Sequence, residues 1–345
     1  MRKSIILWGV LITIMLVSTS CATEEANKEE FTEDEIVVGF SLGTLMEDRW
    51  VRDRDIFLAK AKQRDIRVIV NNANRDSEIQ YQQVMDMLDQ GIDILVIAPN
   101  DSLEEKRCVD AAKDKGIPVI SYDRLILNAN VDLYISFDNT KVGEAIANEL
   151  VKKAPEGGYL IIGGPKSDNN TTLIYEGAKG VLAPYLEDDR ITILGESWID
   201  DWTREGAYQY ATEQIKIHGD NINAIICGND SLAWGVIDAL SEAQMSDKVY
   251  VGAQDADLIA CQRIVNGKQT MTTYKPIPKL VDKTVEACIA LLKGEEIATN
   301  DDIDNGEYSV PSILLDVIPV TKDNIDETVI KDGFHLEEDI YQREK

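Results

Sequence analysis

The sequence predicts an α/β protein made of two doubly wound parallel-sheet lobes, joined by a hinge of several chain crossings. Two observations lead to this fold class. From Ile36 onward, short β-branched apolar runs alternate with longer amphipathic stretches, the pattern of βαβ units in a parallel sheet. The pattern restarts near Tyr159, and a chain of 345 residues is long enough for about two domains.

The first lobe is expected to begin with five strands and three helices. The expected strands span residues 36–42, 67–71, 94–98, 118–122 and 133–137. The expected helices span residues 50–64, 77–90 and 102–115. Gly91 and Gly116 stand where two of these helices should end, because glycine readily adopts the left-handed conformation that terminates a helix.

The second lobe repeats this alternation. Its expected strands span residues 159–163, 191–195, 224–227, 249–252 and 270–274, and its expected helices span 173–183, 204–216, 232–242 and 258–266. A further helix at 277–293 and a strand at 313–319 exceed what this lobe requires. We therefore expect the chain to return to the first lobe after Tyr274 and to cross again near Pro311.

These crossings define the expected domain organisation. The first lobe would contain residues 36–138 and about 276–311, and the second would contain residues 139–275 and about 312–335. Residues 336–345 would form a tail. No short-period repeat is present, which excludes a solenoid.

The amino terminus predicts export. Arg2 and Lys3 precede an apolar or neutral run at residues 5–17, which as a helix would span about 20 Å, short of the roughly 30 Å hydrocarbon core of a membrane. Small residues then precede Cys21, as in the lipobox of bacterial lipoproteins, although Ser18 stands where leucine is usual. We expect residues 1–21 to form a lipoprotein signal ending at a lipidated Cys21, with plain secretion as the alternative.

Residues 22–35 are acidic and predict a flexible tether between this anchor and the fold. The expected location is the outer face of the cytoplasmic membrane or the periplasm. Contact with a membrane would be through the lipid anchor only.

Charge and histidine content exclude several classes of function. The net charge of −27 repels phosphate backbones and anionic lipids, so nucleic acid is not an expected partner. The chain has only two histidines, His218 and His335, too few for a His-rich metal site. It lacks a glycine-rich phosphate loop. We expect no metal and no cofactor.

The remaining cysteines do not form a recognisable motif. Cys108, Cys227, Cys261 and Cys288 are isolated in apolar or helical surroundings, without a C-x-x-C pair. We interpret them as small buried apolar residues. The sequence leaves a disulfide open.

Polar groups follow nearly every predicted strand. They occur at residues 47–50, 122–124, 137–139, 168–170, 198 with 202, 229–230, 254–255 and 274–275. One such group would usually be a turn former or a helix cap. Repetition at equivalent strand ends in both lobes instead favours a ligand site in the cleft between them, because ligands of open α/β sheets bind at the carboxyl ends of the strands.

The chemistry of these groups suits a sugar. Carboxylates accept hydrogen bonds, asparagine both donates and accepts, and arginine or lysine donates, so together they can satisfy hydroxyl groups. Trp50 and Trp202 would offer flat apolar walls to the C–H faces of a pyranose, with a place in the hydrophobic core as the alternative.

At these residues the chain resembles the periplasmic sugar-binding proteins of bacterial ABC importers, in particular their D-xylose-binding members. The resemblance runs from about residue 36 to 334. It is carried by residues 49–50 with 53–57, 122–124, 134–139, 168–170, 254–257, 273–277 and 328–335.

The resemblance implies the type I periplasmic binding protein fold, with two lobes that close on D-xylose or a close monosaccharide. It implies hydrogen bonds to the sugar from Arg49, Asp123, Arg124, Asp168, Asn170, Asn229, Asp255 and Lys275. Trp50 and Trp202 would sandwich the ring. Gly43 and Thr44 stand where the family often has two acids. We expect Asp138, Asn139 and Asp230 to be flanking or hinge groups and His335 to be structural.

The same residues argue against other classes of function. Asp123 and Asp255 could in principle hydrolyse a glycoside, but Arg124 and Lys275 nearby would keep both carboxylates ionised, and catalysis also needs a general acid of raised pKa. A repressor of this architecture needs a basic helix-turn-helix, which is absent. Two roles remain: delivery of sugar to an ABC permease, or signalling to a membrane histidine kinase.

Overall fold

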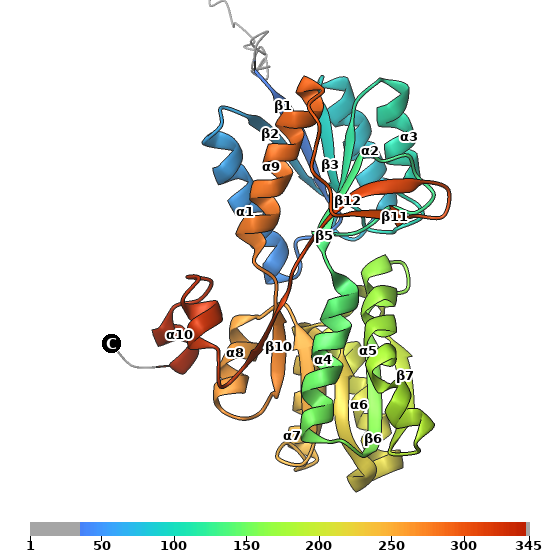
Figure 1. The fold of residues 1–345 in the computed structure, drawn as a ribbon, viewed down its shortest axis with the longest axis vertical. Helices are drawn as coiled ribbons and strands as arrows, with labels where there is room; N and C mark the ends of the chain where they lie inside the picture. Colours follow the sequence, from blue (N-terminus) through green and yellow to red (C-terminus); the bar gives the residue numbers. More distant parts are fainter. Residues whose placement is uncertain (1–34, 343–345) are drawn as a thin grey trace, which may run out of the picture. The chain divides into compact units, whose positions relative to one another are not determined.

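Two sheets with helices packed against them make up residues 35–342, the part of the chain that the computed structural model describes (Figure 1). Within these residues, a seven-stranded sheet forms the first lobe and a six-stranded sheet forms the second. The predicted fold class is confirmed. Residues 1–34 carry the expected signal segment, Cys21 and nearly all of the acidic tether, and these predictions lie outside the described residues.

The first sheet has the strand order β11-β12-β5-β4-β3-β1-β2. Its strands are β1 (Val37–Leu42), β2 (Arg67–Asn72), β3 (Ile94–Ala98), β4 (Val119–Tyr122), β5 (Leu133–Phe137), β11 (Asp301–Asp304) and β12 (Ser309–Leu315). Its helices are α1 (Asp48–Lys62), α2 (Ser77–Asp89), α3 (Lys106–Asp114) and α9 (Ile277–Lys293). Neighbouring strands are parallel except at the edge, where β11 runs antiparallel to β12.

The second sheet has the order β13-β10-β9-β8-β6-β7. Its strands are β6 (Gly157–Gly163), β7 (Ile191–Trp198), β8 (Ile222–Cys227), β9 (Tyr250–Gln254), β10 (Met271–Tyr274) and β13 (Ile318–Thr321). Its helices are α4 (Asn139–Lys153), α5 (Asn169–Glu187), α6 (Arg204–His218), α7 (Asp230–Glu242), α8 (Leu258–Val265) and α10 (Glu337–Tyr341). Only the edge strand β13 is antiparallel to its neighbour.

Alternating strand residues build a separate core on each face of each sheet. In β3, Ile94 and Val96 pack with α1 and α9, whereas Leu95 and Ile97 pack with α2 and α3. The second lobe divides in the same way between α6 with α7 and α4 with α5. Strands buried on both faces read as continuous apolar runs, which is why the sequence identifies them clearly.

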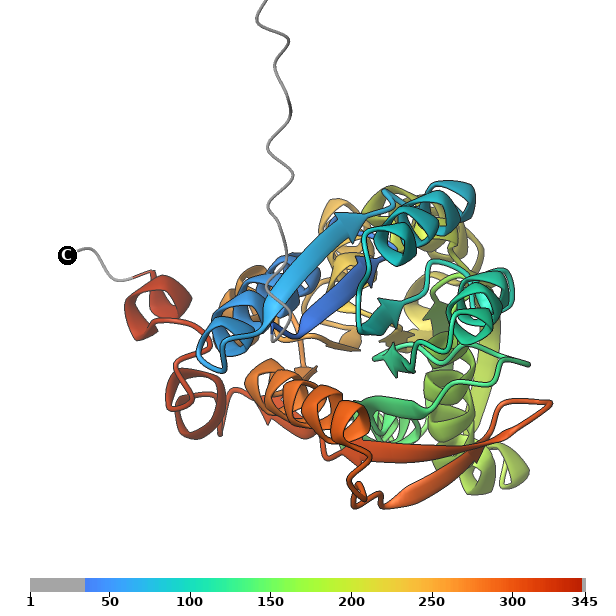
Figure 2. The ribbon, with the colours of Figure 1, turned by 90° about the horizontal axis from the view of Figure 1, so that it is seen from above.

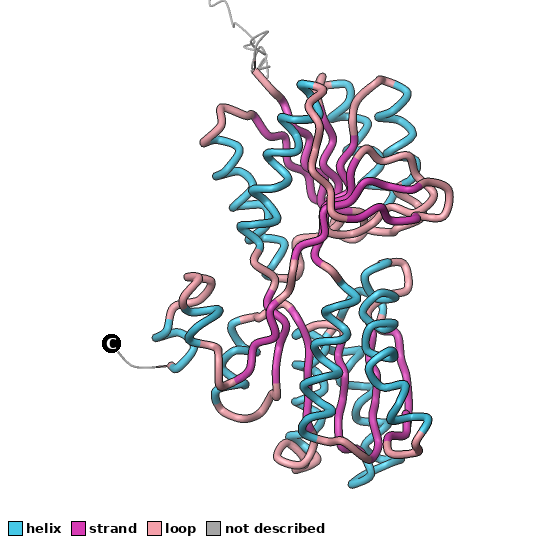
Figure 3. The backbone as a smooth tube through the Cα atoms, viewed as in Figure 1, coloured by secondary structure: helices cyan, strands magenta, loops and turns pink. Residues whose placement is uncertain are grey.

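The last crossing between the lobes lies further along the chain than expected. The chain passes between the sheets after β5, after β10 and after β12 (Figure 3). Pro311, where the third crossing was expected, pairs with Asp302 inside the first sheet, and the crossing lies between Leu315 and Ile318. The predicted strand at 313–319 is therefore wrong as one element, because Asp316 and Val317 separate two strands that belong to different lobes.

Helix α4 was missed by the sequence analysis. It packs against α5 so closely that a Cβ at Gly143 would come within 1.9 Å of the Ile174 carbonyl oxygen. Its apolar residues Val142, Ile146 and Leu150 recur at helical spacing, so the signal for this helix was present in the sequence. The expected tail at 336–345 also folds in part, because α10 lies in it and buries Ile340 in a cluster with Cys261 and Val329.

Two further expectations concern cysteines and membrane-spanning segments. Within residues 35–342, Cys108, Cys227, Cys261 and Cys288 are all buried and free, as the apolar interpretation predicts. None of the helices in this range combines the length and the apolar character needed to cross a bilayer.

Candidate functional site

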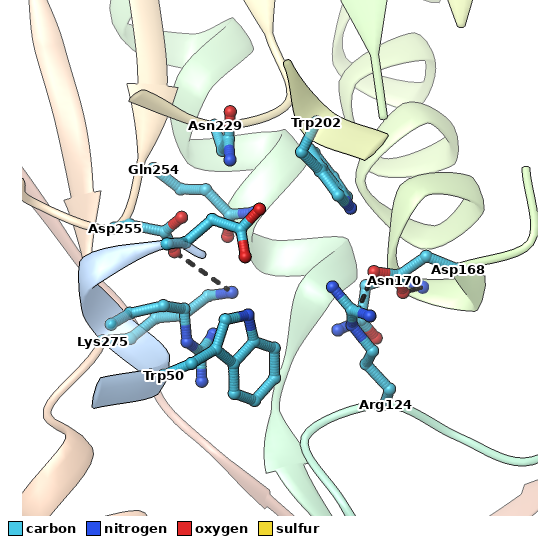
Figure 4. A pocket seen from close by; sticks show the side chains of 11 residues that line it. Trp50, Arg124, Asp168, Asn170, Trp202, Asn229, Gln254, Asp255 and Lys275 are labelled. Atoms are coloured by element: carbon cyan, nitrogen blue, oxygen red, sulfur yellow. Dashed lines mark hydrogen bonds and ion pairs between the residues drawn. The ribbon is translucent and has the colours of Figure 1, made fainter. Parts of the chain in front are cut away.

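A cavity lies between the carboxyl ends of the strands of the two lobes (Figure 4). The free space between the lining side chains is small, about 30 Å³. Its lining residues are Glu47, Arg49, Trp50, Arg124, Asp168, Asn170, Trp202, Asn229, Gln254, Asp255 and Lys275. The structure thus brings together all the site residues expected from the sequence except Asp123, and it adds Glu47 and Gln254.

The first lobe supplies its groups from the start of α1 and from the loop after β4. Glu47 is the N-cap residue of α1, and Arg49 and Trp50 lie in its first turn. Arg124 follows β4 through a turn in which Asp123 has a φ of 61°. Lys275 follows β10, at the crossing where the chain leaves the second lobe for α9.

The second lobe supplies its groups from helix N-termini and tight turns. Asp168 and Asn229 cap α5 and α7, where their side chains accept hydrogen bonds from Asn170 N and Leu232 N. Capping and lining the cavity are therefore compatible roles, because each side chain keeps a second polar atom: Oδ2 of Asp168 pairs with Arg124, and the amide nitrogen of Asn229 remains for another partner. Gln254 ends β9 and Asp255 begins the loop that follows.

Asp123 lies behind the cavity wall, which corrects the expectation that it lines the site. Its Oδ1 is 2.7 Å from Nη2 of Arg49, and its Oδ2 accepts a hydrogen bond of 3.2 Å from the amide of Asn170 in the other lobe. Burial alone would raise the pKa of Asp123, but Arg49, Lys275 and Arg124 hold that pKa below its usual value. Asp123 is therefore an ionised anchor that orients Arg49 and Asn170.

Two further ion pairs join groups of the cavity wall. Nε of Arg124 lies 2.8 Å from Oδ2 of Asp168 and so links the lobes, rather than pairing with Asp123 as the sequence suggested. Lys275 Nζ lies 3.9 Å from Oδ1 of Asp255, as expected (Figure 4). Burial lowers the pKa of Lys275, and the charges of Asp255 and Asp123 oppose this effect.

The lobes also touch through their backbones beside the cavity. Ser102 N of the first lobe donates to Ser167 O of the second at 2.8 Å, and Asn169 N donates to Ser102 Oγ at 3.0 Å. These bonds and the Arg124–Asp168 pair show that the described arrangement of the lobes is a closed one.

The two tryptophans face the cavity from different lobes and are held differently. The ring of Trp50 has the guanidinium groups of Arg49 and Arg124 at 4.4 and 5.0 Å from its centre. Trp202 lies in a turn where both Asp201 and Trp202 have positive φ, and its indole packs on Gly164, at which a Cβ would approach the ring to 2.3 Å. Both side chains also contribute to the hydrophobic cores, so each tryptophan can line the cavity and belong to a core at the same time.

Several buried polar atoms of the lining have no hydrogen-bond partner among the described residues. They include the acceptors Glu47 Oε2, Asn170 Oδ1 and Gln254 Oε1 and the donor Trp202 Nε1. The amide of Gln254 is fixed in this orientation because its Nε2 donates to Gly228 O at 2.8 Å. Buried polar groups are nearly always satisfied, so these atoms indicate a polar occupant.

The flanking residues have structural partners. Asp138 caps α4 by accepting from Lys141 N, and Asn139 donates to Ser136 Oγ and Phe137 O at the first crossing. Asp230 accepts from Asp257 N, Gln269 Nε2 and Thr272 Oγ1. None of the three lines the cavity.

Glu47 and Gln254 were missed as site residues, although each adjoins a residue that was predicted. Glu47 directly precedes the polar start of α1, and Gln254 precedes Asp255 at a strand end. The signal was therefore present in the strand-end pattern. Within residues 35–342, no group of three or more His, Cys, Asp or Glu side chains is arranged to hold a metal ion.

Comparisons with known proteins agree with this architecture. Residues 38–296 match the periplasmic binding protein domain. The chain is 45% identical over 307 residues to a D-xylose-binding periplasmic protein of Haemophilus influenzae, covering 89% of this chain and 92% of that protein. It is 42% identical over 306 residues to a D-xylose-binding periplasmic protein of Escherichia coli, covering 89% and 93%.

Solved structures give the same result. An ABC transporter solute-binding protein from Clostridium phytofermentans with bound β-D-glucose superimposes with a TM-score of 0.82 at 29% identity, covering 88% of this chain and 99% of that one. A carbohydrate transporter solute-binding protein from Chloroflexus aurantiacus in complex with D-glucose gives 0.84 at 28% identity, covering 88% and 98%. The chain therefore belongs to the periplasmic binding protein family and has its type I fold, which confirms the resemblance found in the sequence.

Proposed function

We propose that this periplasmic binding protein captures a pyranose in the cavity between its lobes and delivers it to an ABC importer. The pyranose that we expect is D-xylose. The observation that carries the proposal is the set of unpartnered polar atoms on a cavity flanked by two indoles. Glu47, Asn170 and Gln254 offer acceptors and Trp202 offers a donor. Sugar hydroxyls both donate and accept, so one small polyol can satisfy all four.

The charge balance of the lining supports a neutral ligand. Glu47, Asp168 and Asp255 face Arg49, Arg124 and Lys275, so the lining carries no net formal charge despite the acidic chain. A phosphorylated or acidic sugar would bring an uncompensated negative charge into a buried site, which is costly. A neutral monosaccharide carries no such penalty.

The choice of D-xylose draws on the relatives and on the size of the cavity. The two relatives described above carry that sugar in their names. We expect D-glucose to bind more weakly, because its additional hydroxymethyl group would have to fit among the same buried side chains, which leave little free space.

Isothermal titration calorimetry on the chain lacking residues 1–29 tests the proposal. We expect D-xylose to bind with a Kd of about 1 μM or below, about −8 kcal/mol or better. D-glucose should bind less tightly under the same conditions. Absence of heat with D-xylose, together with binding of an amino acid, would end the sugar proposal.

We infer that the protein does not act on its ligand chemically. Burial raises the pKa of the carboxyl groups of Asp53, Glu105, Asp230 and Asp257, and none of these residues lines the cavity. A general acid of raised pKa at the ligand is what glycoside hydrolysis requires. Incubation with xylosides or xylo-oligosaccharides should release no sugar, and release would overturn this inference.

Delivery to an importer is favoured over signalling, because the structural neighbour from Clostridium phytofermentans is an ABC transporter solute-binding protein. Genes for a permease and an ATPase beside this one would support delivery. A neighbouring gene for a membrane histidine kinase, without a permease, would support the sensing role instead.

We also propose that Cys21 is lipidated and anchors the exported chain. Globomycin, which blocks lipoprotein signal cleavage, should cause an uncleaved precursor to accumulate, and Cys21→Ala should release the protein from membranes. A variant that fractionates as the parent does would refute the anchor and leave export untouched.

A further inference from the structure

The C-terminal residues Phe334 and His335 contact both lobes, far from their place in the sequence. The C-terminal segment, red in Figure 2, lies beside α1, and Arg52 of that helix donates to Phe334 O. The centre of the Phe334 ring lies 4.9 Å from that of Tyr274 at the end of β10, and the guanidinium of Arg52 lies 4.4 Å from the centre of the same Phe334 ring. Phe334 thus packs between a helix of the first lobe and a strand of the second.

The ring nitrogens of His335 have defined roles. Nε2 lies 2.7 Å from the carbonyl oxygen of Ala256, and a carbonyl only accepts, so Nε2 carries the hydrogen. Nδ1 is then free to accept from Nη2 of Arg52 at 3.2 Å, while Nη1 of Arg52 donates to Phe334 O at 2.7 Å. His335 is 7% exposed, so water does not readily replace these bonds.

The loop that His335 holds is the one that carries Asp255 into the cavity. Asp255 and Ala256 have φ values of 99° and 54°, which L residues other than glycine rarely adopt. Such a conformation persists only where surrounding contacts hold it. Here Asp255 N donates to Thr273 O at 2.9 Å and Ala256 N donates to Thr272 Oγ1 at 3.1 Å.

The Ala256 carbonyl completes this set of contacts. Besides the imidazole of His335, its partner in the structure is the weakly donating thiol of Cys261, at 3.5 Å. Loss of the imidazole would leave the carbonyl side of the turn without a strong donor. The turn would then relax toward backbone conformations that point the Asp255 carboxylate away from the cavity.

We propose that His335 is a positioning residue for the ligand, which acts through Asp255 by holding the 255–256 turn in its strained conformation. The proposal rests on the proposed sugar-binding function. It assigns a binding role to a residue that does not line the cavity and that the sequence analysis treated as structural. Through Arg52, the same imidazole ties this turn to α1, the helix that carries Arg49 and Trp50.

Three substitutions separate the two contacts of the imidazole. His335→Gln keeps a donor near the position of Nε2, whereas His335→Asn keeps a polar group near Nδ1 only, and His335→Ala keeps neither. We expect D-xylose affinity to fall on the order of tenfold in His335→Ala and His335→Asn, the typical effect of one lost hydrogen bond, and to be largely retained in His335→Gln. Equal loss in all three variants would overturn the assignment to Ala256.

A matched control removes a similar bond far from the cavity. Tyr159 is buried in the core of the second lobe, and its hydroxyl donates to Ala154 O at 2.7 Å. Tyr159→Phe should lower the melting temperature and leave affinity per folded molecule unchanged. If His335→Ala behaves in the same way, its role is purely structural and the proposal fails.

A double-mutant cycle tests whether His335 acts through Asp255. In the Asp255→Ala background, His335→Ala should change the affinity less than about twofold, since the side chain that it positions is gone. Equal losses in both backgrounds would contradict the proposal.

Hydrogen exchange provides a test that does not depend on the ligand. In the sugar-free protein, His335→Ala should accelerate exchange of the backbone amides of residues 255–257, and Tyr159→Phe should not. Unchanged exchange would overturn the positioning role. Accelerated exchange in a protein that binds no sugar would instead refute only the proposed function.

Discussion

Two groups of buried carboxylates differ in their partners, which are arginines in one group and uncharged donors in the other. At the cavity, Asp123 and Asp168 face arginines at 2.7 and 2.8 Å. At the start of α7, Asp230 receives hydrogen bonds only from a backbone amide, a glutamine and a threonine, and it lies near Asp257 and Asp255. Burial is similar in the two regions, because Asp123 is 1% exposed and Asp230 is 3% exposed.

The difference shows that neighbours, rather than burial alone, decide the protonation state. Burial raises the pKa of Asp230 well above its usual value and that of Asp257 to about 7, and adjacent carboxylates add to both effects. The cations beside Asp123 reverse the same effect. Cations thus hold the pKa of Asp123 low, whereas Asp230 has no cation beside it to offset the effect of burial.

The largest expected effect concerns folding stability. Asp123→Asn leaves the buried Arg49 with Asp53 alone as a counter-ion, at 3.4 Å, and should cost about 3–5 kcal/mol of unfolding free energy. Asp230→Asn replaces one acceptor by a donor but leaves no buried cation without its counter-ion, so it should cost less, about 1–3 kcal/mol. Urea unfolding of both sugar-free variants measures this contrast. Equal costs would mean that Asp230 is ionised in the folded protein.

An intermediate effect concerns affinity. Asp255→Ala removes an acceptor from the cavity and should weaken D-xylose binding roughly ten- to a hundredfold, about 1.5–3 kcal/mol. Asp257→Asn changes a residue two positions along that does not line the cavity, and it should change the affinity less than about twofold. Titration of both variants, with melting temperatures on the same samples, checks the assignment.

Affinity losses should extend to the other polar and aromatic groups of the cavity. Trp202→Ala should weaken binding because it removes apolar area and an unpartnered donor. Unchanged affinity in Asp255→Ala would remove Asp255 from the site. The same result for Lys275→Ala and Arg124→Ala together would mean that the ligand binds elsewhere.

A third expected effect is a pH dependence of folding stability. The pKa of Asp257 is about 7 in the folded protein and lower when unfolded, so the folded state takes up this proton first as the pH falls. Between about pH 7 and 5, this group should therefore stabilise the fold on acidification by at most about 1.4 kcal/mol per pH unit. Asp257→Asn removes this contribution, so the parent should gain stability relative to the variant as the pH falls. A constant difference would contradict the raised pKa.

His335 acts in the opposite direction over part of the same range. Burial lowers its pKa, and the nearby Arg52 adds to this effect. The unfolded chain therefore binds this proton first, and stability from this group is lost as the pH falls below about 6.5, the usual pKa of histidine. His335 is present in both the parent and Asp257→Asn. Its contribution therefore cancels when their unfolding free energies are compared at the same pH.

The parts that could be predicted from the sequence are those that depend on local pattern. Strands buried on both faces stand out as apolar runs, and the polar residues after them mark the cavity because parallel strands end at the same edge. Arg49, Asp168 and Lys275 were identified in this way. Helix α4 was not predicted, although Val142, Ile146 and Leu150 recur in it at helical spacing.

The parts that could not be predicted depend on contacts between distant residues. Asp123 and Arg124 are adjacent in sequence, yet the turn between them sends one behind Arg49 and the other across to Asp168. His335 reaches Ala256 over 79 sequence positions. No local pattern specifies which of several acids meets which cation, or which backbone carbonyl a histidine will meet.

The most direct test of the central claim is a crystal structure of the protein with D-xylose. The account predicts one sugar between Trp50 and Trp202, with its hydroxyls on Glu47 Oε2, Asn170 Oδ1, Gln254 Oε1 and Trp202 Nε1. Asp255 should accept from the sugar, while Asp230 and Asp257 should not touch it. A sugar bound outside this cavity, or a cavity that holds only water at saturating D-xylose, would contradict the account.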